Sequence, residues 1–114
     1  MTQYARQRRM TDTCTVWVES PPDPSDPYSD GGYSVNVYPC NWMQGGKMRR
    51  DREGVEFVPR SSFRLVGEVA IPFGAYIIRG EFADLEPVSG AEIVRDVQTK
   101  TPLRGDTSLS VYTG

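Results

Sequence analysis

The sequence of 114 residues contains no histidine. Histidine is the commonest general base and metal ligand, so Ser-His-Asp and Cys-His catalytic arrangements and the common zinc sites are excluded within the chain. Only two cysteines are present, Cys14 and Cys40. They are too few for a four-thiolate site, and their spacing is not that of a C-x-x-C motif. The sequence therefore predicts no catalytic residue, no metal site and no cofactor, and we expect that the protein is not an enzyme.

Long apolar runs and a charge surplus are also absent. No apolar stretch approaches the ~20 residues that a membrane-spanning helix needs, which predicts no membrane partner. The start, 1–12, is polar and lacks the apolar core of a secretory signal, so we expect a protein made inside the cell with both thiols reduced. Thirteen Lys and Arg against fifteen Asp and Glu leave a net charge of −2. Overall charge thus gives no argument for nucleic acid or an anionic membrane.

What is present is a chain rich in turn residues, with nine prolines and eleven glycines. No window keeps a helical period of 3.6 residues, whereas short β-branched and aromatic stretches alternate with turn signals. This pattern predicts an all-β fold, a small antiparallel β-barrel or sandwich with long loops. The expected strands cover 13–19, 33–42, 55–58, 63–71, 75–79, 91–98 and 107–113.

The domain organisation is simple. We expect a flexible N-terminal arm over 1–12 and a single β domain over 13–114, because a chain this short seldom holds two cores. The domain includes a Pro-rich acidic loop at 20–32, which has four prolines between Pro21 and Pro27. Pro39 falls inside the second expected strand, which predicts an edge or a bend there, since proline cannot donate to a strand ladder.

Two basic clusters are the sharpest charge features. One interpretation is that they contact phosphates without reading a base sequence. The other is a solvated hairpin tip, in which Asp51 and Glu53 partly offset the charge of the second cluster. The clusters are Arg6, Arg8 and Arg9 in the arm and Lys47, Arg49, Arg50 and Arg52 in the domain.

The aromatic residues support an alternative function. Small five-stranded barrels that bind single-stranded nucleic acid present exposed aromatics among basic residues on one face. In this chain the aromatics lie within apolar alternations, which is more typical of a core; they include Trp17, Phe57, Phe63 and Tyr76. The nucleic-acid-binding barrel remains the second hypothesis.

The order of features from Cys14 onward resembles a known family. The first half has a β-branched strand (CTVWVES), a long loop that ends at Asp30-Gly31-Gly32, and a strand that ends near an aromatic (YSVNVYPCNW). The second half has FRLVGEVAIPFGAYIIRG and the final AEIVRDVQTKTPLRGDTSLSVYTG. Over about residues 13–113 this order is similar to that of the head-closure proteins (stopper or head–tail connector) of long-tailed bacteriophages.

That resemblance implies a structural virion protein, assembled in the host cytoplasm. Its expected form is a homo-oligomeric ring of roughly six or twelve subunits that closes the portal channel after DNA packaging and docks the tail. The implied partners are further copies of the chain, the portal or adaptor ring, tail proteins and packaged double-stranded DNA.

Within such a ring the charged loops would have separate roles. One hypothesis places Arg49 and Arg50 on the DNA path, with the acidic segments Asp23–Asp30 and Glu81–Glu86 toward neighbouring proteins or solvent. The alternative is that the basic loop contacts the adjacent subunit and pairs with those same acidic segments.

Overall fold

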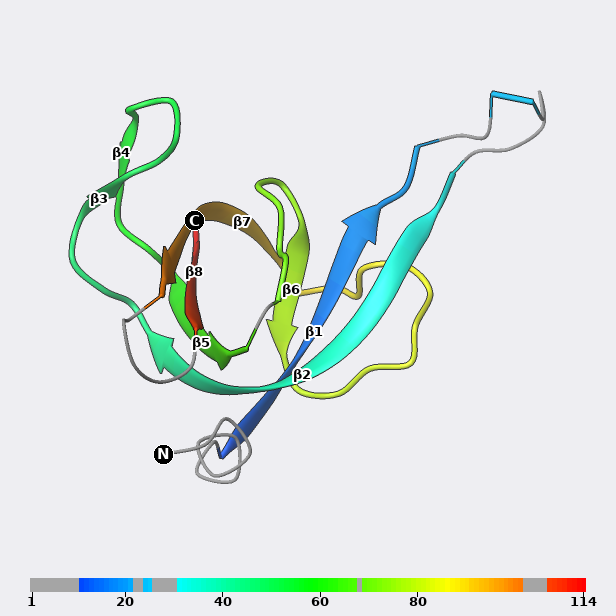
Figure 1. The fold of residues 1–114 in the computed structure, drawn as a ribbon, viewed down its shortest axis with the longest axis horizontal. Coiled ribbons are helices and arrows are strands. Elements are labelled where there is room, and N and C mark those ends of the chain that lie inside the picture. The colour runs from blue at the N-terminus through cyan, green and yellow to red at the C-terminus, as the bar shows by residue number, and fades with distance from the viewer. Residues whose placement is uncertain (1–10, 22–23, 26–30, 68, 102–106) are drawn as a thin grey trace.

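The computed structural model is all-β, with six antiparallel strands closed into a barrel (Figure 1). It describes residues 11–21, 24–25, 31–67, 69–101 and 107–114. The order around the barrel is β1-β2-β5-β8-β7-β6, and β3 and β4 form a separate two-stranded sheet. The predicted fold class is confirmed, as a barrel rather than a sandwich. No helix in the described ranges is long and apolar enough to cross a membrane.

The strand ends agree with the expected ranges to within two residues, apart from the end of β5 and the additional strand β3. The first strand starts earlier, at Asp12, which lies in the predicted arm; the rest of that arm lies outside the described residues. Strand β5 ends at Val66 rather than at 71, because Gly67 has a φ of 105° that breaks the extended chain. Strand β3 was not predicted. The bounds are β1 Asp12–Glu19, β2 Tyr33–Gln44, β3 Arg49–Arg50, β4 Glu56–Phe57, β5 Ser61–Val66, β6 Tyr76–Arg79, β7 Glu92–Lys100 and β8 Ser108–Thr113.

The barrel interior is filled by alternating residues of these strands, since successive side chains in a strand point to opposite faces. Inside lie Cys14 and Val16 of β1, with the buried core completed by Cys40, Phe63, Leu65, Ile71, Ala75, Ile77, Val94, Leu109 and Val111. The expectation that Phe63 lies in the core is confirmed, whereas Phe57 and Tyr76 are only half-buried.

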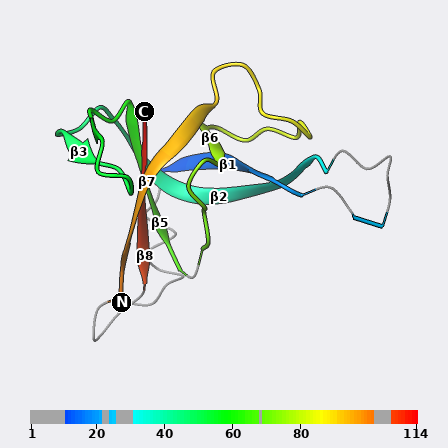
Figure 2. The same ribbon diagram turned by 90° about the horizontal axis from the view of Figure 1, so that it is seen from above.

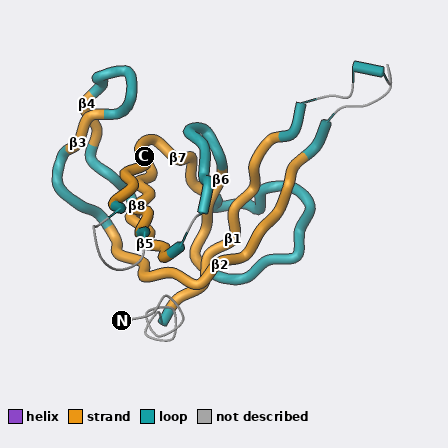
Figure 3. Tube along the Cα trace, in the orientation of Figure 1, coloured by secondary structure: helices purple, strands orange, loops and turns teal. Residues whose placement is uncertain are grey.

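Strand β1 is buried on both faces. Its outward-facing residues, Thr15 and Trp17, are fully buried although neither belongs to the barrel core. The loop between β6 and β7, residues 80–91, crosses β1 in the view of Figure 3 and contacts both residues. Thr15 Oγ1 donates to the Gly80 carbonyl at 2.8 Å and accepts the Phe82 amide at 3.0 Å. The Trp17 indole donates to the Asp84 carbonyl at 2.9 Å. These contacts fix the loop to the barrel.

Strand β2 changes partner along its length just after Pro39, where the sequence predicts an edge or a bend. Residues 33–40 pair with β1, and Asn41–Gln44 pair with β5. The first half of β2 and the end of β1 therefore extend beyond the barrel as a two-stranded ribbon (Figure 1). The Ser20 amide donates to the Gly32 carbonyl at 2.9 Å and closes the base of the Pro-rich loop, of which 22–23 and 26–30 lie outside the described residues.

The two cysteines lie next to each other inside the barrel. Cys14 and Cys40 are free and fully buried, in agreement with the predicted free thiols. The hydrogen bond between the two side chains, together with burial, raises the pKa of the Cys14 thiol. Both cysteines pack in the barrel core, as small buried hydrophobic residues do.

Candidate functional site

The predicted basic cluster lies on a β-hairpin that projects from one end of the barrel, residues 47–58 (Figures 1 and 2). Within it, Arg50 is opposite Glu56 across the β3–β4 pair. The turn is built by Asp51, whose carbonyl accepts the Gly54 amide at 3.0 Å and whose Oδ1 accepts the amides of Glu53 and Val55 at 2.9 and 3.0 Å. Gly54 has a φ of 82°, a value that favours glycine.

Arg49 is directed back onto the barrel. Its Nε and Nη2 donate to Asp96 Oδ2 at 3.2 and 3.1 Å. Its guanidinium also lies over the Tyr112 ring, 3.7 Å from the centroid. This planar group is thus held from two directions, by a carboxylate and by a ring face. Arg49 links the hairpin to β7 and β8.

In a second ion pair, beside the first, the hairpin supplies the carboxylate and the barrel supplies the cation. Asp51 Oδ2 accepts Arg95 Nη2 at 2.9 Å, and the Asp51 side chain is 3% exposed. Arg95 and Asp96 are consecutive in β7, where the register with β8 shifts between Val94 and Asp96. Such an irregularity lets two consecutive side chains face the same side of a strand. The bulge therefore gives the hairpin both an acidic and a basic partner.

The other basic side chains of the hairpin remain open to solvent. Arg50 pairs with Glu56 at 3.1 Å, but the two side chains are 71% and 51% exposed. Arg52 lies 5.2 Å from the centroid of the Phe73 ring. Lys47 is exposed, and no ion pair joins it to another described residue. Lys47, Arg49, Arg50 and Arg52 all lie on the hairpin, but Arg49 is turned onto the barrel; Arg6, Arg8 and Arg9 lie outside the described residues.

The same hairpin carries exposed apolar side chains, which were not predicted from the sequence. Met48, Val55 and Val58 are 62%, 50% and 63% exposed. Apolar groups add nothing to phosphate binding, whereas mixed apolar and arginine surfaces are typical of contacts between proteins. The hairpin has the composition of a protein interface.

Cations already cover several of the aromatic rings. Arg79 lies 4.5 Å from the Trp42 centroid and Arg95 lies 4.8 Å from that of Phe57, as Arg49 does over Tyr112. Bases that stack on a protein need open ring faces. Each covered ring has lost one face, which weakens the case for a nucleic-acid-binding barrel.

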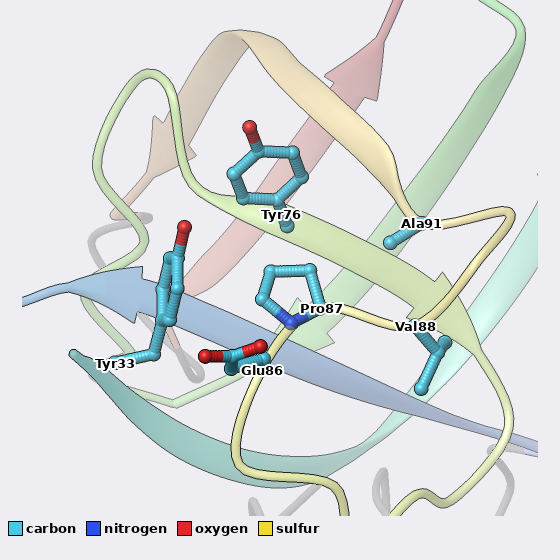
Figure 4. A pocket seen from close by; sticks show the side chains of 6 residues that line it. All are labelled: Tyr33, Tyr76, Glu86, Pro87, Val88 and Ala91. Carbon is cyan, nitrogen blue, oxygen red and sulfur yellow. The ribbon is translucent and has the colours of Figure 1, made fainter.

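A second feature lies where the start of β2, the start of β6 and the 80–91 loop meet, and it was not predicted from the sequence. Tyr33 of β2, Tyr76 of β6 and Glu86 of the 80–91 loop line a surface hollow of about 410 Å³ (Figure 4). The two tyrosines lie far apart in the sequence. They meet because β1 pairs with both strands, with Glu19 opposite Tyr33 and Trp17 opposite Tyr76.

No group of three potential metal ligands occurs among residues that the structure describes. Comparison of the chain with protein-family models, with curated proteins and with solved structures gave no significant match. Among the described residues, the hairpin combines cations with exposed apolar side chains, and the hollow combines a carboxylate with two tyrosine rings.

The anchoring of the hairpin is expected to depend on acid pH. The hydrogen bond from Arg95, with those from the Val55 and Glu53 amides, holds the pKa of Asp51 below its ordinary value of 3.8. A lowered pKa in the folded state stabilises the fold above the ordinary value, and this stabilisation is lost as pH falls through the lowered one. We expect the NMR signals of the Glu53 and Val55 amides to shift toward unstructured positions below about pH 3.8.

Asp51→Asn is the matched variant for this acid effect. It removes the charge, so the hairpin should be loosened at every pH and the acid-dependent change should vanish. Glu56 is a carboxylate of the same hairpin that pairs with Arg50 and not with Arg95, so Glu56→Gln serves as the control and should keep the acid effect. An acid transition that is the same in all three proteins would contradict the role given to Asp51.

Proposed function

We propose that this chain is a ring-forming structural subunit at the head–tail junction of a long-tailed bacteriophage virion. In this role it closes the portal channel after DNA packaging and docks the tail. It acts by assembly and not by catalysis. Its partners are further copies of itself, the portal or adaptor ring, tail proteins and packaged DNA, which it meets without reading bases.

The observation that carries the proposal is the placement of two unlike projections. The hairpin lies at one end of the longest dimension, and the 80–91 loop lies apart from it along that dimension, beyond β6, in both views (Figures 1 and 2). Each projection exposes large apolar side chains, with Leu85 of the loop 80% exposed. Unlike surfaces on separate parts of one subunit favour a head-to-tail contact, which closes into a ring when the rotation between copies permits.

The decisive experiment uses particles of the phage that encodes the chain. Antibody labelling in the electron microscope should place the protein at the neck of tailed particles, and averaged images should show it as a ring beneath the portal. Mutant phage that lacks the chain should produce filled heads that lose DNA and carry no tail. A stable monomer that binds single-stranded oligonucleotide tightly and is absent from particles would instead favour the nucleic-acid-binding barrel.

A further inference from the structure

The tyrosine-lined hollow has the chemistry of a cation site. The Tyr33 and Tyr76 rings meet edge to face, with centroids 6.3 Å apart and planes at 81°. Figure 4 shows both hydroxyl groups pointing the same way, with Glu86 and Pro87 at the foot of the rings in this view. Val88 and Ala91 complete the lining. Aromatic faces beside a carboxylate attract a cation both through the ring quadrupole and through charge.

The charges around the hollow have one sign. The 80–91 loop contains Glu81, Asp84 and Glu86 but neither lysine nor arginine. No ion pair joins Glu86 to another described residue. Burial, followed by the nearby Glu19, Tyr76 and Glu86, raises the pKa of Tyr33, as expected where negative charges oppose a further one. A positively charged group on a binding partner would therefore complement this surface.

We propose that the hollow binds the guanidinium group of Arg50 from the hairpin of a second copy of this chain. The inference rests on the proposed ring and names the contact that builds it. Arg50 leaves its exposed partner Glu56 and exchanges it for Glu86, while the guanidinium plane stacks on a tyrosine ring.

Arg50 is the best-suited cation of the hairpin. Arg49 is held by Asp96 and Tyr112, and Arg52 lies over Phe73. The Arg50 side chain is 71% exposed and has a single ion-pair partner in the described chain. Arginine is also preferred to lysine where a cation stacks on an aromatic ring, because its planar group is more weakly hydrated.

We assign the donor to a second copy because the hairpin and the 80–91 loop, which carries Glu86, project from separate parts of the barrel (Figures 1 and 2). The surroundings of the two sites also match. Met48, Val55 and Val58 surround the basic side chains, and Leu85 lies beside Glu86 on the loop. A basic apolar hairpin thus faces an acidic apolar hollow, and the contact repeats from copy to copy.

The test mixes two full-length variants, each with one half of the contact. Arg50→Glu keeps the hollow and is labelled with ¹³C-tyrosine; Glu86→Arg keeps the hairpin and is unlabelled. Neither should associate with itself, but the mixture should associate, because it restores the contact of Arg50 with Glu86 and its exchanged charges are complementary as well. We expect the Tyr33 and Tyr76 signals to shift on mixing, and the labelled copy should bind its partner at least tenfold more tightly than it binds unlabelled Arg50→Glu protein.

Two further variants sharpen the test. The double variant R50E/E86R restores complementary charges and should regain self-association. Arg64→Glu on β5 and Glu81→Arg in the loop make the same charge changes at exposed positions outside the contact, so both should self-associate like the unchanged protein. Should Glu86→Arg misfold, Glu86→Gln with Arg50→Gln repeats the mixing test without charge reversal.

Tyrosine signals that stay unmoved at millimolar concentration, or that move equally with the Arg50→Glu partner, would overturn the contact. Failure here and failure of the proposed function are separable. Rings seen in particles without this contact would leave the connector function standing and remove only the Arg50 site. If the contact forms in solution but the chain is absent from particles, the Arg50 site stands and the connector function is removed.

Discussion

Replacing Trp17 by alanine is expected to lower the free energy of unfolding by about 3–5 kcal/mol. The side chain is fully buried, and its ring centroid lies 6.4 Å from that of Phe82. The indole also donates to the Asp84 carbonyl at 2.9 Å. Alanine would leave a cavity beneath the 80–91 loop and would remove one of the hydrogen bonds that join the loop to the barrel. Since small domains are stable by only about 5–15 kcal/mol, much of the protein should unfold near physiological temperature.

Trp42→Ala is the matched control for Trp17→Ala. Trp42 is half-buried on β2 and is covered on one face by Arg79, so its truncation removes less buried area. We expect roughly half the loss seen for Trp17. Urea unfolding followed by circular dichroism measures both values. Equal losses of unfolding free energy in the two variants would show that the 80–91 loop does not bury Trp17 as described.

Trp17 also illustrates what strand alternation can and cannot predict. The alternating pattern of β1 identified the strand, and apolar neighbours indicated that Trp17 is buried. Alternation alone predicts one buried face, whereas Thr15 and Trp17 lie on the outer face and are buried by a loop from a distant part of the chain. Which loop covers a strand is decided by tertiary packing, and no local pattern encodes it.

The hairpin shows a similar limit. Turn residues and charge located the basic cluster, but strand β3 has only two residues, Arg49 and Arg50, and no apolar alternation. Its position depends on ion pairs to Arg95 and Asp96, which a bulge in β7 turns toward the hairpin. Neighbouring arginines that look equivalent in the sequence thus have different surroundings.

The hollow could not be predicted from the sequence because its residues come from three separate segments. Tyr33 and Tyr76 become neighbours only through their common partner strand β1. The nearest sequence signal was the acidic loop, whose expected role toward a neighbouring protein remains a prediction and agrees with the proposed Arg50 contact.

The difference between Arg49 and Arg50 leads to the second large effect. Arg49→Glu is expected to destabilise the protein by about 1–3 kcal/mol, because breaking a partly buried ion pair leaves one charge without its partner. The new carboxylate would also face Asp96, and the cation over Tyr112 would be lost. Arg50→Glu, at an exposed pair, should change stability by no more than about 0.5 kcal/mol. Denaturant unfolding measures both, and amide exchange of the hairpin locates the loss.

Arg49→Lys distinguishes geometry from charge. Lysine keeps the positive charge but cannot make the paired Nε and Nη2 contacts or stack its plane on a ring, so only part of the stability should return. Full stability in Arg49→Lys, or equal losses in Arg49→Glu and Arg50→Glu, would contradict the anchoring role.

Under the proposed connector function, an assembly or DNA-retention defect caused by Arg49→Glu would reflect a displaced hairpin, because Arg49 anchors it. The choice between the DNA path and the subunit contact therefore depends on Arg50, whose replacement leaves the fold in place: loss of ring assembly assigns it to the interface, and rings that assemble but leak DNA assign it to the channel.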